Sequence, residues 1–310
     1  KVLRNGNFRM KTHKEIYLGA QKLATSIDEV SGTEVKIEGE TFYKIANYDA
    51  MRPFFMSIVS NSNHWMFLSS SGGLTAGRKN SNFALFPYYT DDKITESSET
   101  TGSKTLCLVS RSGQTSLWEP FSSKYEGVYN LSRNLYKNSY GNKVKFEEVN
   151  HDLGLTFSYE WNSSDKFGFV RKSALTNNGS AGVSVQFIDG LQNLLPYGVE
   201  DALQNASSNL VDAYKKCELE ASVGLGLFSL SAIIVDKAEP SEALRSNVAW
   251  SLGRPNATKL LSSKQLNAFR KGEWPTQEVD IKAERGAYMI CDTVDLDAGA
   301  SEHWSILADV

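Results

Sequence analysis

A strict alternation of apolar and polar side chains is the feature that most restricts how this chain can fold. In Leu155–Trp161 every odd position is apolar or aromatic and every even position is polar. Successive side chains of a strand point to opposite faces of a sheet, so this pattern indicates a strand with one buried face. It recurs in Lys143–Glu147, Val183–Phe187 and Phe228–Ile234. Turn-rich links between such segments leave no room for helical crossovers, so we expect antiparallel hairpins and meanders.

The number of expected strands predicts the architecture. A single twisted open sheet seldom grows that wide, so the strands favour two stacked sheets around one core. At 310 residues and 41% hydrophobic content, the chain can bury about 75% of the surface that its unfolded form exposes. We therefore predict an all-β fold with a few helices, organised as a large antiparallel two-sheet supersandwich. Further strands are expected at Phe42–Tyr48, Phe54–Val59, Lys104–Val109, Lys166–Leu175 and Ala287–Val294.

Two segments break the alternation and predict helices. In Val199–Lys216 apolar residues recur at spacings of three and four, which is typical of one amphipathic helix lying on a sheet. Glu200 and Asp201 then stand at its positive N-terminal end. Ser262 with Gln265 forms a capping box for a shorter helix that ends near Gly272. The apolar face of the first helix consists of Val199, Leu203, Ala206, Leu210 and Tyr214.

Charge and composition exclude several classes of partner. The formal net charge is −3, from 33 basic and 36 acidic residues that are interspersed, so the chain lacks the basic footprint of a nucleic-acid-binding protein. The longest apolar stretch, Val223–Val235, contains glycines and serines and is too short to cross a bilayer. Neither nucleic acid nor membrane is therefore an expected partner. The three cysteines have no paired spacing and are expected to pack as small apolar residues.

Two segments rich in aromatic and polar residues are the candidates for recognition. Asn61–Ile94 and Trp118–Asn138 combine ring faces, small residues, arginines and carboxylates, which suit a polyhydroxylated ligand such as a sugar. If two such loops meet at one edge of the sandwich, they make a sugar-facing rim. The alternative is that the aromatics are core residues and the glycines only make turns, and residue types alone favour neither. The candidate substrate-binding residues are Trp65, Arg78, Tyr88, Asp91, Asp92, Trp118, Tyr125, Arg133 and Asn134.

No catalytic or metal site is predicted. The histidines never occur as H-x-x-x-H or H-x-H, and the chain has no G-x-S-x-G elbow. A glycosidase needs two carboxyls facing each other, but adjacent residues such as Glu147 and Glu148 point to opposite faces of a strand. His151 beside Asp152 could form a general base, but an ordinary turn between two strands is the expected context.

Several runs of residues resemble a known family when taken in order. His64–Arg78, Phe86–Tyr88 and Asp91–Ile94 resemble the N-terminal domain of cellobiose-phosphorylase-like enzymes, glycoside hydrolase family 94 and its relatives. The resemblance covers roughly residues 42–310, whereas the first forty residues depart from it and are expected to form an extension (1–40) packed on or beside a supersandwich domain (41–310). Further matching runs are Leu117–Pro120, Gly168–Arg171, Ile188–Asn193 and Val235–Pro240.

The resemblance implies a function as well as a fold. In this family an N-terminal β-supersandwich of the galactose-mutarotase type precedes a linker and an (α/α)6 barrel, which carries the general-acid carboxylate. Either inorganic phosphate, as a co-substrate of the parent enzyme, or water then attacks the anomeric carbon, and no cofactor is expected. The sandwich packs on the barrel, helps to form dimers and can lend loop residues to the substrate cleft. Among the matching positions, Arg78 is the expected hydroxyl-binding or phosphate-binding side chain.

The sequence therefore predicts a non-catalytic N-terminal domain of a glycoside phosphorylase or hydrolase acting on β-glucosides or related oligosaccharides. Its expected partners are an oligosaccharide, its own C-terminal helical barrel and a second copy in a homodimer. A stand-alone carbohydrate-binding sandwich is an alternative. An aldose mutarotase is a further alternative, in which histidine and glutamate would exchange the anomeric proton.

Overall fold

The computed structural model describes residues 15–24, 29–234 and 243–310. About half of these residues lie in antiparallel sheets, and every strand pair in the described ranges is antiparallel. The predicted all-β class is therefore confirmed. The motif Val235–Pro240 lies outside the described residues.

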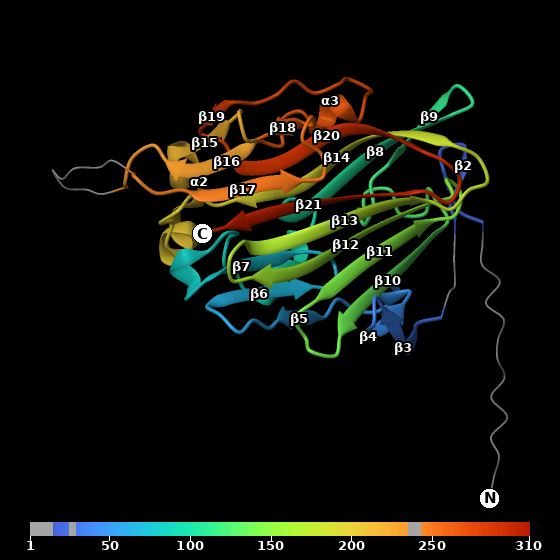
Figure 1. Ribbon diagram of the computed structural model, residues 1–310, viewed down its shortest axis with the longest axis horizontal. Coiled ribbons are helices and arrows are strands. Elements are labelled where there is room, and N and C mark those ends of the chain that lie inside the picture. The colour runs from blue at the N-terminus through green and yellow to red at the C-terminus, as the bar shows by residue number, and fades with distance from the viewer. Residues whose placement is uncertain (1–14, 25–28, 235–242) are drawn as a thin grey trace, which may run out of the picture.

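An eleven-stranded sheet forms one layer of the molecule (Figure 1). Its central strands follow the predicted alternation: in β12, Leu155, Phe157, Tyr159 and Trp161 are buried. From one edge to the other its strands are β19 (Asp280–Lys282), β15 (Lys215–Glu220), β16 (Leu225–Leu230), β17 (Asn247–Leu252), β21 (Ser301–Asp309), β13 (Gly168–Asn177), β12 (Leu155–Ser164), β11 (Val144–Asn150), β10 (Leu131–Asn138), β4 (Glu40–Ala46) and β3 (Ser31–Ile37).

Two smaller sheets cover the inner face of the large sheet. A five-stranded sheet contains β18 (Thr258–Leu260), β20 (Gly286–Leu296), β14 (Val183–Leu194), β8 (Gly102–Arg111) and β9 (Gln114–Trp118), in that order. A three-stranded sheet contains β5 (Phe55–Ile58), β6 (His64–Ser69) and β7 (Leu74–Arg78). The second layer is thus divided between two sheets. The short strands β1 (Tyr17–Leu18) and β2 (Gln21–Lys22) form a separate hairpin.

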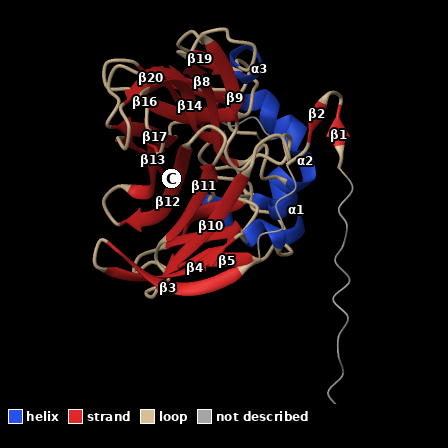
Figure 2. Ribbon diagram, turned by 90° about the vertical axis from the view of Figure 1, so that its right-hand side faces the viewer, coloured by secondary structure: helices blue, strands red, loops and turns tan. Residues whose placement is uncertain are grey.

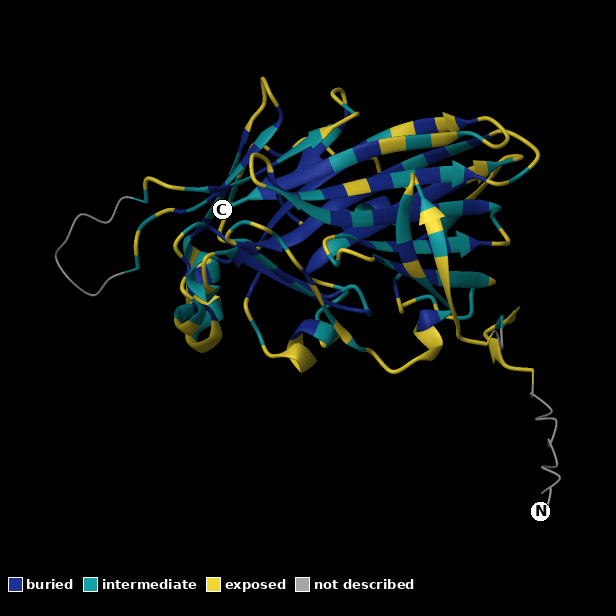
Figure 3. Cartoon of the chain, turned by 60° about the horizontal axis from the view of Figure 1, so that its bottom comes forward, coloured by how far each residue is buried: buried dark blue, intermediate teal, exposed yellow. Residues whose placement is uncertain are grey.

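One continuous apolar core lies between these layers, as Figure 3 shows by the buried interior of the strands. Phe187 of β14 stacks on Trp304 of β21 with ring centroids 4.5 Å apart, so this pair joins the two layers directly. Phe146 and Tyr159 stack within the large sheet at 5.0 Å. Such offset stacking adds about 0.5–1.5 kcal/mol per pair to the burial of the rings. The cysteines Cys107, Cys217 and Cys291 are buried and free, which confirms the expectation for them.

The first forty residues include part of the large sheet. Strand β3 pairs with β4 along its whole length, from Ser31 opposite Ala46 to Ile37 opposite Glu40. The expected boundary at residue 40 therefore falls on the first residue of β4, directly after the turn of this hairpin, with the edge strand of the sheet on its N-terminal side. Residues 1–14 and 25–28 of the expected extension lie outside the described residues.

In the described part of the chain, three helices lie along one side of the sheets (Figure 2): α1 (Asp91–Glu96), α2 (Asp201–Tyr214) and α3 (Leu266–Phe269). Helix α2 confirms the predicted amphipathic helix, although Lys215 and Lys216 belong to β15. Its buried face differs from the prediction because the backbone leaves the helical conformation at Ser207. That break turns Val211 into the core and leaves Leu210 46% exposed.

The predicted capping box is wrong. Helix α3 is a single turn, and Gln265 at its N-cap makes no capping hydrogen bond. Instead the hydroxyl of Ser262 and the side-chain amide of Gln265 both donate to Oε1 of Glu278, at 3.0 and 2.9 Å. A buried carboxylate needs several donors, so Glu278 takes both side chains away from the helix end. Two further one-turn 3-10 helices occur at Tyr48–Ala50 and Ser81–Phe83.

Candidate functional site

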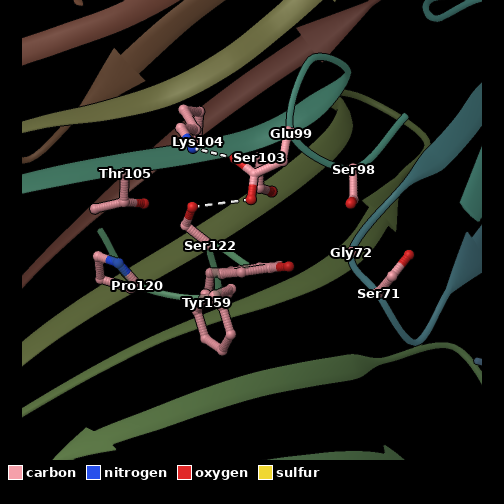
Figure 4. A pocket seen from close by; sticks show the side chains of 11 residues that line it. Ser71, Gly72, Ser98, Glu99, Ser103, Lys104, Thr105, Pro120, Ser122 and Tyr159 are labelled. Carbon is pink, nitrogen blue, oxygen red and sulfur yellow. Dashed lines mark hydrogen bonds and ion pairs between the residues drawn. The ribbon is translucent and has the colours of Figure 1, made fainter. Parts of the chain in front are cut away.

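A small polar pocket opens where several chain segments meet between the layers (Figure 4). Its walls come from the turn between β6 and β7, from the segment after α1, from β8, from the loop after β9 and from β12. The polar groups along these walls are mainly hydroxyls, with one lysine and one glutamate. In that order the segments contribute Ser71 and Gly72, then Ser98 and Glu99, then Ser103–Thr105, then Pro120–Ser122, and finally Tyr159.

The turn between β6 and β7 reaches the pocket because two glycines allow a tight path. Gly72 has φ of 94°, a conformation that side chains rarely adopt. A Cβ on Gly73 would stand 1.9 Å from the carbonyl oxygen of Ile94, so the turn packs directly on the backbone of α1. Ser71 donates to the carbonyl of Thr95 at 3.0 Å. The expectation of a loop at this position is wrong, because residues 64–78 form a β-hairpin.

A chain of alternating charges begins at the wall of the pocket formed by Glu99 and Lys104 and extends away from it. Lys104 Nζ is 2.7 Å from Glu99 Oε2 and 2.9 Å from Glu119 Oε2. Arg270, at the end of α3, donates through Nη2 to the same Glu119 oxygen at 3.0 Å. Lys104 and Glu119 are buried, so each depends on its partners to offset the loss of hydration. Four residues from four different segments thus form one neutral cluster.

Glu99 is the acidic end of this cluster. Burial opposes its ionisation, but the ammonium of Lys104 and the backbone amide of Ser123 outweigh that effect and lower the pKa of Glu99 to about 2. Glu99 Oε1 accepts from the Ser122 hydroxyl at 2.9 Å and from the Ser123 amide at 2.8 Å. The carboxylate is therefore ionised at neutral pH and fixed in place, which suits an acceptor for hydroxyl groups.

A second charged group lies directly behind the pocket. Arg171 of β13 forms a bidentate pair with Asp189 of β14, with N–O distances of 2.7 and 2.9 Å. Asp189 also accepts from Thr105, Ser173 and Trp304, while Arg171 Nε donates to Ser103. Both side chains are 0% exposed. Ser103 and Thr105 line the pocket, so this pair holds two pocket hydroxyls in fixed orientations.

The loop after β9 is held by Glu148 of β11. Its carboxylate accepts from Trp118 Nε1 at 2.7 Å, from the backbone amide of Phe121 at 2.8 Å and from Arg133 Nε at 2.7 Å. Phe121 has φ of 64°, which is unusual for a bulky residue. A strained conformation persists only where surrounding contacts enforce it, and here the Glu148 contact does so.

The dimensions of the pocket limit what it can hold. Its volume is about 20 Å³, which is enough for one water-sized group but not for a ring. Hydroxyls and an ionised carboxylate surround that volume. The pocket can therefore accept one hydroxyl of a ligand whose remaining atoms lie outside it.

Three of the predicted binding residues lie near this pocket without lining it. Trp118 is buried, and it meets Arg133 at Glu148, so these two side chains support the loop. Tyr125 lies close to the charge cluster, and burial together with Glu119 raises its pKa. The two aromatic segments meet at this pocket through Ser71–Gly72 and Pro120–Ser122, and none of the nine predicted binding residues lines it.

The other predicted binding residues lie elsewhere. Arg78 forms a bidentate pair with Asp309, with both N–O distances 2.7 Å. Trp65 and Tyr88 form an edge-to-face pair at 5.5 Å, in which Tyr88 is exposed. Asp91 and Asp92 are exposed in the first turn of α1, and the hydroxyl of Thr90 with two backbone amides lowers the pKa of Asp92. Asn134 donates to Glu147 at 2.9 Å.

The residues that sequence reasoning missed are Glu99, Lys104, Arg171, Asp189 and Arg270. Arg171 and Asp189 did lie within runs that carry the family resemblance. The alternation along β13 could have identified Arg171, because Phe169, Arg171 and Ser173 share the inward face of that strand. A charged residue on a buried face needs a buried partner of opposite charge. Arg270 and Glu99 gave no such signal, because they are 171 positions apart in sequence and meet only through Lys104 and Glu119.

The three described histidines, His64, His151 and His303, do not line the pocket. Burial and the charge of Arg78 lower the pKa of His64. His151 lies in the predicted turn between β11 and β12, where Nε2 is 2.8 Å from the Ser132 hydroxyl. Within the described ranges, His, Cys, Asp and Glu side chains form no group of three that could hold a metal ion. In the same ranges no helix has the length and apolarity to span a membrane.

No protein-family model and no curated protein sequence matches this chain. Among solved structures it is similar to a polysaccharide lyase, with 12% identity and a TM-score of 0.41 over 83% of this chain and 32% of that chain. It is also similar to a galactose mutarotase-like protein from Lactobacillus casei, with 10% identity and a TM-score of 0.43. A third similar structure is a protein assigned as an aldose 1-epimerase from Escherichia coli K12, with 10% identity and a TM-score of 0.40.

The last two similarities cover 83% of this chain and 99% of those proteins. At these identities and TM-scores the likeness is distant. The chain spans about a third of the length of the polysaccharide lyase. Membership of glycoside hydrolase family 94 stays a prediction.

Proposed function

We propose that this chain is a carbohydrate-binding β-sandwich domain of a carbohydrate-active enzyme, in which it contributes binding rather than bond breaking. The observation that supports this function best is the convergence of the two segments with sugar-binding composition on one polar pocket. Ser71–Gly72 and Pro120–Ser122 bring hydroxyls to the carboxylate of Glu99, which is held ionised. An ionised acceptor beside hydroxyls is what one ligand hydroxyl requires.

Following the family resemblance, we further propose that the parent enzyme is a glycoside phosphorylase or hydrolase acting on β-glucosides or related oligosaccharides. The sandwich would support a helical barrel that carries the general acid, with inorganic phosphate or water as the acceptor, and would take part in a homodimer. The reading frame tests the first part: coding sequence for a long helical domain after Val310 would support it. Light scattering of the purified protein tests the dimer.

Titration calorimetry tests carbohydrate binding directly. We expect the protein to bind at least one member of a tetrasaccharide panel comprising cellotetraose, xylotetraose, laminaritetraose, maltotetraose and tetragalacturonate. Binding of none of them by a folded protein would contradict the proposed function. Trp118→Ala is unsuitable for this test, because Trp118 is buried and its removal would leave a cavity.

Ser98→Leu tests the pocket itself. Ser98 lines the pocket, and its hydroxyl makes no hydrogen bond within the described part of the chain, so a larger side chain here would obstruct the pocket without breaking a hydrogen bond. We expect about tenfold weaker binding, equivalent to about 1.4 kcal/mol. Ser208→Leu is the matched control, because Ser208 is also half-buried but lies on α2 and lines no part of the pocket. Equal affinities of the two variants would exclude this pocket as part of the site.

A further inference from the structure

A second, larger pocket adjoins the first on the other side of residues 98–101. Glu99 lines the small pocket and Thr100 lines the larger one. Gln192 of β14 lies between them, because its side-chain amide donates to the carbonyl of Glu99 at 2.8 Å while the residue lines the larger pocket. The other walls are Asn193, Asp212 of α2, Ser263–Lys264 and Ala283–Arg285.

The two pockets differ in capacity. The larger one measures about 410 Å³, by the same measure that gives about 20 Å³ for the small one. Pockets that hold small ligands measure roughly 300–1,000 Å³. The larger pocket therefore has room for a ring, whereas its neighbour has room for one hydroxyl.

A bulge in β14 brings two amide side chains into the same place. Adjacent residues of a regular strand point to opposite faces. Between Gln192 and Leu194 the register with β20 shifts, and Asn193 has φ of 59°. Gln192 Nε2 donates to Glu99, and Asn193 Nδ2 donates to the Thr101 hydroxyl at 2.9 Å, so both side chains face the segment 99–101. Bulges of this kind often redirect side chains beside functional sites.

The side chains at this pocket suit a neutral ligand with many hydroxyls. Asn193 Oδ1 accepts no hydrogen bond within the described residues, which leaves an acceptor for a ligand. Arg285 is 55% exposed. Within the described ranges its guanidinium donates from Nε to Asp212, so its two terminal nitrogens can bind a pair of ligand oxygens. Lys264 pairs with Glu284 at 2.9 Å. The formal charges of the four charged residues that line the pocket, Asp212, Lys264, Glu284 and Arg285, therefore sum to zero. A neutral lining does not favour an acidic sugar over a neutral one.

We propose that this pocket, lined by Gln192, Asn193 and Arg285, is a subsite for one neutral hexose unit of an oligosaccharide, and that the neighbouring small pocket takes a hydroxyl of the same ligand. This inference rests on the proposed carbohydrate-binding function and specifies the site. Amide groups and a guanidinium then bind the hydroxyls of the ring, and the shared segment 98–101 sets the distance between the two contacts.

Cellotetraose binding, measured by calorimetry, tests the subsite with two variants and a control. Asn193→Gly removes the amide, and glycine adopts the same positive φ readily. Arg285→Ala removes an exposed guanidinium. We expect each to weaken binding about fivefold to tenfold, since a hydrogen bond to a charged or amide group is lost. Arg52→Ala, at an exposed arginine that lines neither pocket, should stay within about twofold of the wild type.

The outcomes separate this inference from the proposed function. If the wild type binds cellotetraose and both variants bind equally well, the subsite is wrong while carbohydrate binding stands. Binding of no tetrasaccharide at all by the wild type would remove the proposed function itself. Preference for tetragalacturonate over cellotetraose would overturn the neutral hexose. Crystals soaked with cellotetraose should show a sugar ring beside Asn193 and Arg285, and density only at another place would contradict the assignment.

Discussion

Two charged clusters lie on either side of Ser103 and Thr105, and they differ in their access to solvent. Arg171 and Asp189 are fully buried between the sheets, where Asp189 accepts five hydrogen bonds from side chains. The cluster of Glu99, Lys104, Glu119 and Arg270 borders an open pocket. Similar pairs of ions therefore differ in their surroundings: the first joins the two layers, and the second leaves the carboxylate of Glu99 at the pocket where we propose that a ligand hydroxyl binds.

This difference follows from the number of fixed partners. A buried ion is stable when donors and acceptors of the protein replace all its water. Arg171 and Asp189 meet that condition within the sandwich. Glu99 meets it in part and keeps a side that faces the pocket, so water or a ligand hydroxyl can complete its contacts. Only the second cluster can change partners without unfolding.

The largest expected effect comes from breaking the buried pair. Arg171→Met should lower the free energy of unfolding by about 3–5 kcal/mol, because it leaves the carboxylate of Asp189 buried without its counter-ion. Denaturant unfolding followed by fluorescence measures this loss. The double variant Arg171→Met/Asp189→Leu removes both charges and should recover part of it. A loss below about 1 kcal/mol in the single variant would show that Asp189 is not held by charge.

The pocket cluster should respond to pH. The pKa of Glu99 is lowered from 4.5 to about 2 in the folded protein, so its contribution is complete above pH 4.5 and is lost as the pH falls through about 2. A difference of that size corresponds to roughly 3 kcal/mol. The free energies of unfolding of the wild type and of Glu99→Gln, measured between pH 7 and pH 2.5, should differ by a constant amount above pH 4.5 and approach each other below it. Curves that stay parallel throughout would contradict this assignment.

The smallest expected effect concerns Arg78 and Asp309, whose side chains are 20% and 22% exposed. Arg78→Ala should lower the free energy of unfolding by about 1 kcal/mol, since the bidentate geometry is favourable but solvent screens the pair. Asp309→Ala should lower the free energy of unfolding by a similar amount, and the double variant should lower it little further than either single variant. Weaker cellotetraose binding by Arg78→Ala with unchanged stability would instead favour the binding role that the family resemblance implies.

The alternation of side chains predicted much of the fold because it records which face of each strand is buried. Leu155–Trp161, Val183–Phe187 and Ala287–Val294 all lie in strands whose apolar side chains enter the core. Helix periodicity was less reliable. The spacing of apolar residues placed Leu210 on the buried face of α2, but the break at Ser207 exchanged it for Val211. The spacing of apolar residues assumes a regular helix, so it cannot predict a break in the helical backbone such as the one at Ser207.

The sequence by itself determined most of the central strands and their inner faces, since the alternation depends on neighbouring residues alone, but it did not show the hairpin at residues 64–78. The tertiary structure decided which distant segments meet. Glu99, Lys104, Glu119 and Arg270 come together because β8, β9 and α3 are adjacent in space, and Gln192 and Asn193 share a pocket because β14 bulges against β20. The polar sites of this protein arise from long-range packing, because a buried charge needs partners that its own strand cannot supply.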